Sequence, residues 1–320
     1  MNVPSKKLSN SEAADKWPFL LPFMTVMLIS FSLTALIWIA LSPRTPTPSS
    51  EAISSKKTSL FASNYPANGT FQRELVQLKN RKDLKESDEL EIQKYLLASA
   101  DYLEIPPALA WCLLFQESRL NHLEGIELDK PSSGLGQFSR FSFFEINSQL
   151  DRFSPNALNL IYLSFGRDIR PIAAKSKDTV SSSSYFSIPT AVTSSTIYLH
   201  NRYFQLSKIL EKRAIDYNPD ILWLFAAMAY NKGSRSVIAL WNLVLKKQGQ
   251  ESFYKLLHDY DYFNATVNDP LLLTKSISKI WEDKKSKPYA AELGAHIKNI
   301  SACSVSPLFQ TTRSLTGAEP

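Results

Sequence analysis

Two uninterrupted apolar runs stand out in a chain of 320 residues. They are residues 108–115 (ALAWCLLF) and 221–230 (ILWLFAAMAY). A helix that is apolar on every side has no face that suits water, so it must be buried. We therefore expect two central helices. Pro106 and Pro107 suit the start of the first, and Gly233 suits the end of the second.

Amphipathic patterns predict further helices around these two. Apolar residues recur at helical spacing over residues 86–103 and 189–212. Shorter helices are predicted over 141–150, 155–165, 236–247, 252–259, 270–281 and 288–300. Residues 167–187 are polar and serine-rich and are interpreted as an insert. The pattern predicts a mostly α-helical domain over residues 83–301, followed by a disordered tail, 302–320.

The N-terminal region has a different pattern. A short tail, residues 1–16, precedes residues 17–43, which contain no charged side chain. About 20 apolar residues cross a bilayer, so this stretch predicts a transmembrane helix. The alternative is a cleaved signal peptide, whose apolar region is usually shorter. Residues 44–82 begin with a sequence rich in Pro, Ser and Thr and are interpreted as a linker.

Composition agrees with a helical fold and limits the classes of molecule that the protein is expected to bind. The chain has 9 glycines, where average usage gives about 22, and few glycines indicate few tight turns. A formal net charge of +6 favours anionic partners: nucleic acid, anionic lipid or acidic cell-wall polymers. No recognised nucleic-acid-binding motif is present in the sequence, which argues against nucleic acid as a partner. The four histidines lack a metal-pairing spacing, so we expect no metal and no cofactor.

Cys112 and Cys303 are the two cysteines of the chain. Neither belongs to a CxxC pair or to a zinc-ligand spacing. Because Cys112 lies in the first apolar run, the sequence favours a buried free thiol. A disulfide with Cys303 is the alternative if the domain lies outside the cytosol.

Glu117 follows the first apolar run almost directly. Burial and the negative end of the helix both disfavour an ionised carboxylate there, so we expect a raised pKa. Such an acid can protonate the leaving oxygen of a glycosidic bond. The alternative is an ordinary exposed glutamate at a helix end.

Two motifs come later in the chain. The first is Gly134-Leu135-Gly136-Gln137, in which the glycines allow close backbone approach to a ligand and Gln137 can bond sugar hydroxyls or an acetamide. The second is Ala229-Tyr230-Asn231, which ends the second apolar run. A tyrosine hydroxyl and an asparagine amide at a helix terminus can both point into a cleft. Taken alone, each motif is also explained as a turn or as core packing with a cap.

In this order, the motifs resemble those of the soluble lytic transglycosylase family, which is related to goose-type lysozymes. That family has an E-S pair at the end of a core helix, matched here by Glu117 and Ser118, then G-L-x-Q and then A-Y-N. Residues 105–109 resemble the entry to that helix. Residues 288–297 resemble a later E-T-R-x-Y-V pattern, with His296 where the family has tyrosine. The resemblance spans about residues 89–300.

The resemblance implies a lysozyme-like domain that cleaves peptidoglycan between N-acetylmuramic acid and N-acetylglucosamine. Glu117 would be the acid and then the base, and Ser118, Gly134 and Gln137 would position the substrate. Tyr230 and Asn231 would line the cleft, with the Tyr230 hydroxyl bonded to Glu117. In the family the N-acetyl group of the substrate assists and an anhydro-sugar results, so no second carboxylate is required.

Two alternatives remain open. A hydrolase of the goose-type-lysozyme kind would use a second acid, and Glu124, Glu127 and Asp129 follow Glu117 in the same loop. The other is a catalytically inactive, membrane-anchored protein that binds or assembles the wall. With the predicted anchor, the interpretation is a single-pass bacterial inner-membrane protein whose domain faces peptidoglycan in the periplasm.

Overall fold

A computed structural model describes residues 59–124, 132–139, 142, 145–146, 186–278, 280 and 283–307, with the backbone alone for 283–286. The chain divides into two units, 1–57 and 58–320, and all described residues belong to the second. Within the described ranges the chain forms nine helices, no strand, and two isolated β-bridges. The predicted mostly α-helical class is confirmed. The helices predicted over 141–165 and the insert at 167–187 lie largely outside the described residues.

The two apolar runs form the helices at the centre of the core. They are α4 (Pro107–Ser118) and α8 (Pro219–Lys232), and all residues of both runs are buried. Burying one large apolar side chain stabilises the fold by about 1.5–3 kcal/mol, so these runs dominate the core. The side chain of Asn218 caps α8 by accepting a bond from the backbone N–H of Asp220. Gly233, with φ 78°, ends α8 as predicted.

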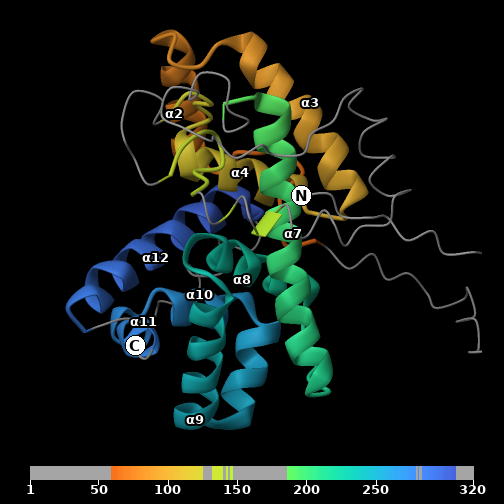
Figure 1. Cartoon of the computed structure of the whole chain (residues 1–320). Helices are drawn as coiled ribbons and strands as arrows, with labels where there is room; N and C mark the ends of the chain where they lie inside the picture. Colours follow the sequence, from red (N-terminus) through yellow and green to blue (C-terminus); the bar gives the residue numbers. More distant parts are fainter. Residues whose placement is uncertain are drawn as a thin grey trace, which may run out of the picture. The chain divides into compact units, whose positions relative to one another are not determined.

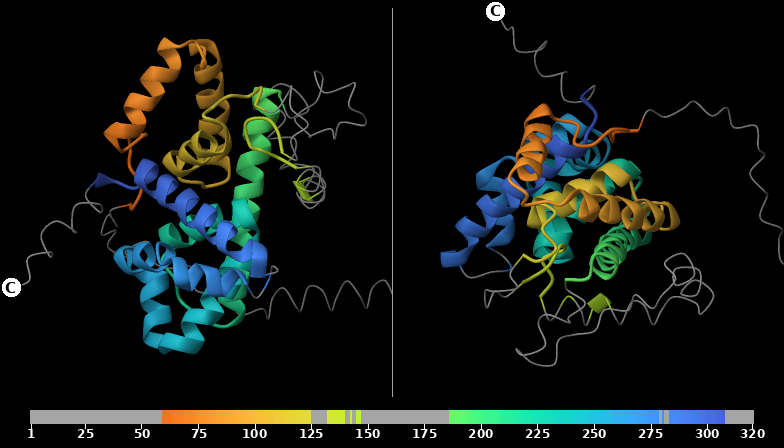
Figure 2. Two further views of the ribbon diagram at one scale, coloured as in Figure 1. Left: turned by 90° about the vertical axis from the view of Figure 1, so that its left-hand side faces the viewer. Right: turned by 90° about the horizontal axis from the view of Figure 1, so that it is seen from above.

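Longer amphipathic helices pack around α4 and α8. They are α3 (Glu86–Tyr102), α7 (Ile188–Lys212), α9 (Ser234–His258) and α12 (Asp283–Ser304). Helix α7 packs against α3 and α8, and α12 packs against α4 and α8 (Figures 1 and 2). The break expected near residue 249 is present inside α9, where Gly249 is non-helical. Two short helices, α10 (Tyr260–Val267) and α11 (Pro270–Ile277), begin at the capping aspartates Asp259 and Asp269.

The segment from residue 59 to residue 82 differs from the prediction. It was expected to belong to the linker, yet it contains α2 (Gly69–Asn80), and Leu60 and Phe61 are buried in the core. Backbone bonds join Ala62 N–H to the Ser304 carbonyl and Ser306 N–H to the Leu60 carbonyl. These contacts reach the far end of the chain, so a local composition pattern does not reveal them.

The two cysteines form a disulfide, which corrects the interpretation of Cys112 as a free thiol. Cys112 is buried, as its apolar surroundings predicted. Its partner Cys303 lies 191 residues later, and the two Cα atoms are 5.8 Å apart. The bond joins α4 to the C-terminal end of α12.

The predicted transmembrane helix over 17–43 lies outside the described residues. Among the helices described, none combines the length and the apolar character needed to span a bilayer.

Candidate functional site

Glu117 lies in the last turn of α4, with its side chain 10% exposed. Burial raises the pKa of its carboxyl group to about 8, the nearby Lys232 lowers it, and Glu292 raises it further. Burial is the largest of these causes, because the charged form of a carboxyl group is poorly solvated in an apolar setting. The raised pKa expected from the sequence is confirmed. At neutral pH the group is therefore an acid that still holds its proton.

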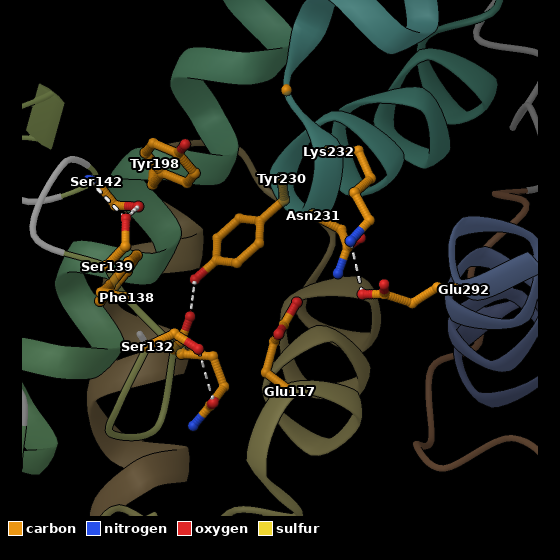
Figure 3. A pocket seen from close by; sticks show the side chains of 13 residues that line it. Glu117, Ser132, Phe138, Ser139, Ser142, Tyr198, Tyr230, Asn231, Lys232 and Glu292 are labelled. Atoms are coloured by element: carbon orange, nitrogen blue, oxygen red, sulfur yellow. Dashed lines mark hydrogen bonds and ion pairs between the residues drawn. The ribbon is translucent and has the colours of Figure 1, made fainter. Parts of the chain in front are cut away.

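Glu117 opens into a cavity of about 410 Å³, within the range of small-ligand pockets. Figure 3 shows its carboxyl group extending from α4 towards the space between Tyr230 and the Lys232–Glu292 pair. The cavity is lined by Glu117, Ser132, Gly136, Gln137, Phe138, Ser139, Ser142, Tyr198, Tyr230, Asn231, Lys232, Gly233 and Glu292. The motifs 134–137 and 229–231 therefore meet at one cavity with Glu117, as their order in the chain suggested.

The turn at 132–139 forms one wall of the cavity. An isolated bridge pairs Ser133 with Phe138, and Gly134 adopts φ 74° within it. The side chain of Gln137 is occupied by the turn itself. Its Nε2 donates to the Gly134 carbonyl at 2.9 Å, and its Oε1 accepts from Ser132 Oγ at 3.2 Å. Gln137 thus shapes the wall. A substrate would have to compete with Ser132 and Gly134 for hydrogen bonds to its amide.

Tyr230 joins this turn to α8. Its hydroxyl donates to the Gly136 carbonyl at 2.9 Å and lies 3.3 Å from Ser195 Oγ. The expected bond to Glu117 is replaced by this one, although the nearby Glu117 does help burial to raise the pKa of Tyr230. The Tyr230 ring meets that of Tyr198 edge to face at 5.0 Å. The two rings and Phe138 form an aromatic side of the cavity (Figure 3).

Gly136 is held so closely that no side chain fits. A Cβ atom placed there would lie 2.3 Å from Ser195 Oγ and 2.7 Å from the Phe138 ring. We expect Gly136→Ala to destabilise the domain by about 1–3 kcal/mol through overpacking, which lowers its melting temperature by about 3–10 °C. The control is Gly69→Ala, because a Cβ atom on Gly69 meets nothing within 4 Å. Thermal unfolding of both variants checks this, and equal melting temperatures would contradict it.

Asn231, Lys232 and Glu292 form the opposite side. Lys232 Nζ lies 2.7 Å from Glu292 Oε1, so an ion pair connects α8 to α12 beside Glu117 (Figure 3). The ammonium group of Lys232 also lies over the Tyr289 ring, 4.8 Å from its centre. Asn231 Oδ1 is buried and has no hydrogen-bond partner within the described part of the chain. The residue lines the cavity, but this oxygen itself is sealed from solvent.

The ion pair predicts shifts of opposite sign in the pKa of Glu117. Lys232→Met removes a positive charge and should raise this pKa, whereas Glu292→Gln should lower it. We expect about half a pH unit in each direction, because solvent screens the half-exposed Glu292. Carbon-13 NMR titration of the Glu117 carboxyl group measures both shifts. The matched control is Glu211→Gln, which breaks a Lys208–Glu211 pair of the same 2.7 Å on α7 and should shift nothing. Two shifts of the same sign would refute the assignment.

Other predicted site residues lie elsewhere or outside the described chain. The Ser118 hydroxyl donates to the Leu114 carbonyl at 3.2 Å, so it serves its own helix. Gly134 shapes the turn, and its N–H donates to the Glu124 carbonyl at 2.8 Å. Glu127 and Asp129, the predicted second acids, lie outside the described residues.

Sequence reasoning missed Lys232, Glu292 and Tyr198. Lys232 directly follows the Tyr230-Asn231 motif, and Glu292 lies within the segment that resembled the family's last motif, so position relative to the motifs was an available signal. Tyr198 has no such signal. It reaches the cavity only because α7 packs against α8.

His296 lies on α12, next to the carboxyl group of Glu117. Its Nε2 is 3.6 Å from Glu117 Oε1, and its side chain is 5% exposed. Burial lowers the pKa of the ring to about 4, and Lys232 lowers it further. The histidine is thus neutral at the pH where Glu117 is also neutral.

Among the described residues, no group of three or more His, Cys, Asp or Glu converges on a position suited to a metal ion. Comparisons of the chain with protein-family models, with curated proteins and with solved structures find no match.

Proposed function

We propose that this protein cleaves the glycan strands of peptidoglycan between N-acetylmuramic acid and N-acetylglucosamine, as a lytic transglycosylase. The observation that supports this most is Glu117, a buried carboxylic acid with a pKa of about 8 at the edge of a cavity. A group of this kind remains protonated at neutral pH and can protonate a glycosidic oxygen.

The proposed reaction uses Glu117 twice. It first gives its proton to the bridging oxygen, and the bond from that oxygen to the anomeric carbon of the muramic acid breaks. The N-acetyl group of the same sugar stabilises the carbon that loses the oxygen. The Glu117 carboxylate then takes a proton from a hydroxyl of that sugar, whose oxygen closes on the carbon to give an anhydro-sugar. The acid is restored, and no water is consumed.

The walls of the cavity suit a sugar ring. Phe138, Tyr198 and Tyr230 offer aromatic surface on one side, and such rings pack against the apolar faces of ligands. Ser139 and Ser142 place hydroxyl groups on the same side, and Asn231 and Glu292 line the other. The surface of the cavity is predominantly polar, which suits the hydroxyl and acetamide groups of a sugar.

The disulfide supports the proposed location outside the cytosol. Disulfides such as Cys112–Cys303 form and persist in oxidising compartments, including the bacterial periplasm. We propose that residues 17–43 anchor the chain in the inner membrane and that the helical domain faces the wall. The net charge of +6 suits an anionic polymer.

A hydrolase is the second candidate, and Glu292 is the observation that favours it. This second carboxyl group lines the same cavity as Glu117. A glycosidase that consumes water commonly uses two carboxyl groups, the second as a base or a nucleophile. Here Glu292 is bonded to Lys232, which restrains it on the α12 side of the cavity.

Product analysis tests the proposal and separates the candidates. The full chain, purified in detergent, is incubated with peptidoglycan, and the released fragments are identified by mass spectrometry. We expect anhydro-muramic ends, which are one water lighter than reducing ends. Reducing ends alone would support the hydrolase. No release of fragments, together with binding to the wall, would support the catalytically inactive wall-binding alternative.

A further inference from the structure

Two buried polar atoms face each other behind the cavity. Glu117 Oε1 and His296 Nε2 are both sealed from solvent, and within the described residues neither has a hydrogen-bond partner. They lie 3.6 Å apart, on α4 and α12 respectively. A buried polar atom without a partner costs about 1–3 kcal/mol, so two such atoms at this distance are unexpected in a purely structural contact.

We propose that His296 is a positioning residue for Glu117: its ring donates Nε2–H to Oε1 and thereby directs the acidic proton to Oε2. This inference rests on the proposed function, in which Glu117 is the proton donor. Oε1 is the sealed oxygen, and the side chain is 10% exposed and lines the cavity, so Oε2 is the oxygen available to a ligand. The proton is thus held on the side where a glycosidic oxygen would be bound.

The protonation states of Glu117 and His296 are consistent with a histidine proton on Nε2. Between about pH 4 and pH 8 both groups are neutral. A neutral histidine carries one N–H, on either nitrogen. If Nδ1 held it, Nε2 would draw the acidic proton to Oε1, away from the cavity. Once Glu117 has given its proton to the substrate, the Nδ1–H tautomer would also place the lone pair of Nε2 next to the negatively charged carboxylate. The Nε2–H tautomer instead donates to Oε1 before and after transfer.

The distance also fits a contact that tightens during the reaction. An N–H···O bond has a typical length of about 2.9 Å, so the two groups need to approach by about 0.7 Å. Catalytic hydrogen bonds are often long without substrate and shorten in the complex. As the carboxylate forms, its charge strengthens the bond, because hydrogen bonds to charged acceptors are shorter and stronger.

Burial, and secondly the charge of Lys232, keep the histidine neutral by lowering the pKa of its ring. Glu117 faces it from α4, and α8 contributes Lys232, which lowers the pKa of the ring, and Tyr230 beside Glu117. On α12 itself, Glu292 pairs with Lys232, whose ammonium group lies over the Tyr289 ring. A cation beside the ring disfavours imidazolium. His296 therefore acts as a neutral donor and not as the partner of an ion pair.

The first test needs no substitution. Nitrogen-15 NMR of the full wild-type chain in detergent reports which ring nitrogen of His296 carries the proton. We expect the Nε2–H tautomer, without titration, from pH 5 to pH 7.5. A ring protonated on Nδ1, or one that titrates near the ordinary value of about 6.5, would overturn the proposal.

The second test compares His296→Leu with His296→Gln. Leucine fills similar space without a donor, whereas a glutamine amide can donate from near the Nε2 position. Without the donor the carboxylate is less stabilised, so in the leucine variant the pKa of Glu117 should rise by about one pH unit. Its kcat should fall about tenfold, which matches the loss of one such bond. The glutamine variant should stay within about threefold of wild type. Equal Glu117 titrations in all three proteins, or equal losses in both variants, would overturn the proposal.

The readouts also separate this proposal from the proposed function. The histidine tautomer and the Glu117 titration are measured without substrate. If both behave as expected and the wild-type chain releases no glycan fragments, the assigned reaction fails and the pairing stands. If fragments are released but the leucine variant leaves the Glu117 titration unchanged, the pairing fails and the reaction stands.

Discussion

Replacing Glu117 with glutamine is expected to abolish glycan cleavage and, above pH 5, to make the folded domain more stable. General acid catalysis contributes about 10²–10⁴-fold to rate, so activity should fall by at least that range. The change in stability also comes from the carboxyl group of Glu117. The carboxyl group has a pKa of about 8 in the folded chain, against an ordinary value of 4.5. From pH 4.5 upwards, folding must take up a proton, and this cost grows until about pH 8.

The sign of this effect makes the prediction specific. At pH 8 the cost is on the order of 3–5 kcal/mol, and glutamine does not incur it. Chemical denaturation of wild type and Glu117→Gln should therefore agree near pH 4.5 and diverge towards pH 8, with the variant more stable. The control is Glu91→Gln on α3, which should match wild type in stability and activity. Parallel stability profiles, or cleavage retained in Glu117→Gln, would contradict the assignment.

Opening the Cys112–Cys303 bond should cost about 2–5 kcal/mol of stability, because the bond restricts the unfolded chain over a separation of 191 residues. For a domain of this size the melting temperature should fall by about 5–15 °C. These are the two cysteines of the chain, so a reductant acts on a single bond. Thermal unfolding with and without reductant measures the effect, and a thiol assay verifies that the bond has opened.

Activity should fall with reduction even below the melting temperature. Cys112 precedes Glu117 on α4, and Cys303 follows His296 on α12, so the bond fixes the spacing of the two helices that hold the acid and the histidine. The matched control is the double variant Cys112→Ala/Cys303→Ala, which should show the low melting temperature and no response to reductant. A reduced wild-type chain with unchanged melting temperature would refute the stabilising role.

The parts of the fold that the sequence predicted are those determined by local pattern. Burial of α4 and α8 follows from runs with no polar residue, and the end of α8 follows from Gly233. The raised pKa of Glu117 follows from its place beside one such run. Each of these depends on neighbours within a few turns of helix, so composition and spacing are sufficient.

Contacts between distant segments could not be predicted in the same way. The disulfide, the packing of residues 60–62 on the end of α12, and the Lys232–Glu292 pair all join residues at least 60 apart. The motifs also indicated which kinds of residue lie near the site better than they indicated where each side chain points. Ser118 was predicted to bind substrate, yet its hydroxyl bonds to its own helix, because a serine near a helix end readily donates to the carbonyl four residues before it.

The place of α12 near the C-terminal end of the chain has a consequence for the newly made protein. Glu117 leaves the ribosome long before Lys232, Glu292, His296 and Cys303, and the last three all lie on α12. Until that helix docks, Glu117 lacks the neighbours on α12 that help to bury it, so the main cause of its raised pKa is incomplete. Translation order thus delays the complete surroundings of Glu117 until α12 is in place, and a chain that stops short of this helix lacks Glu292, His296 and the disulfide to Cys303.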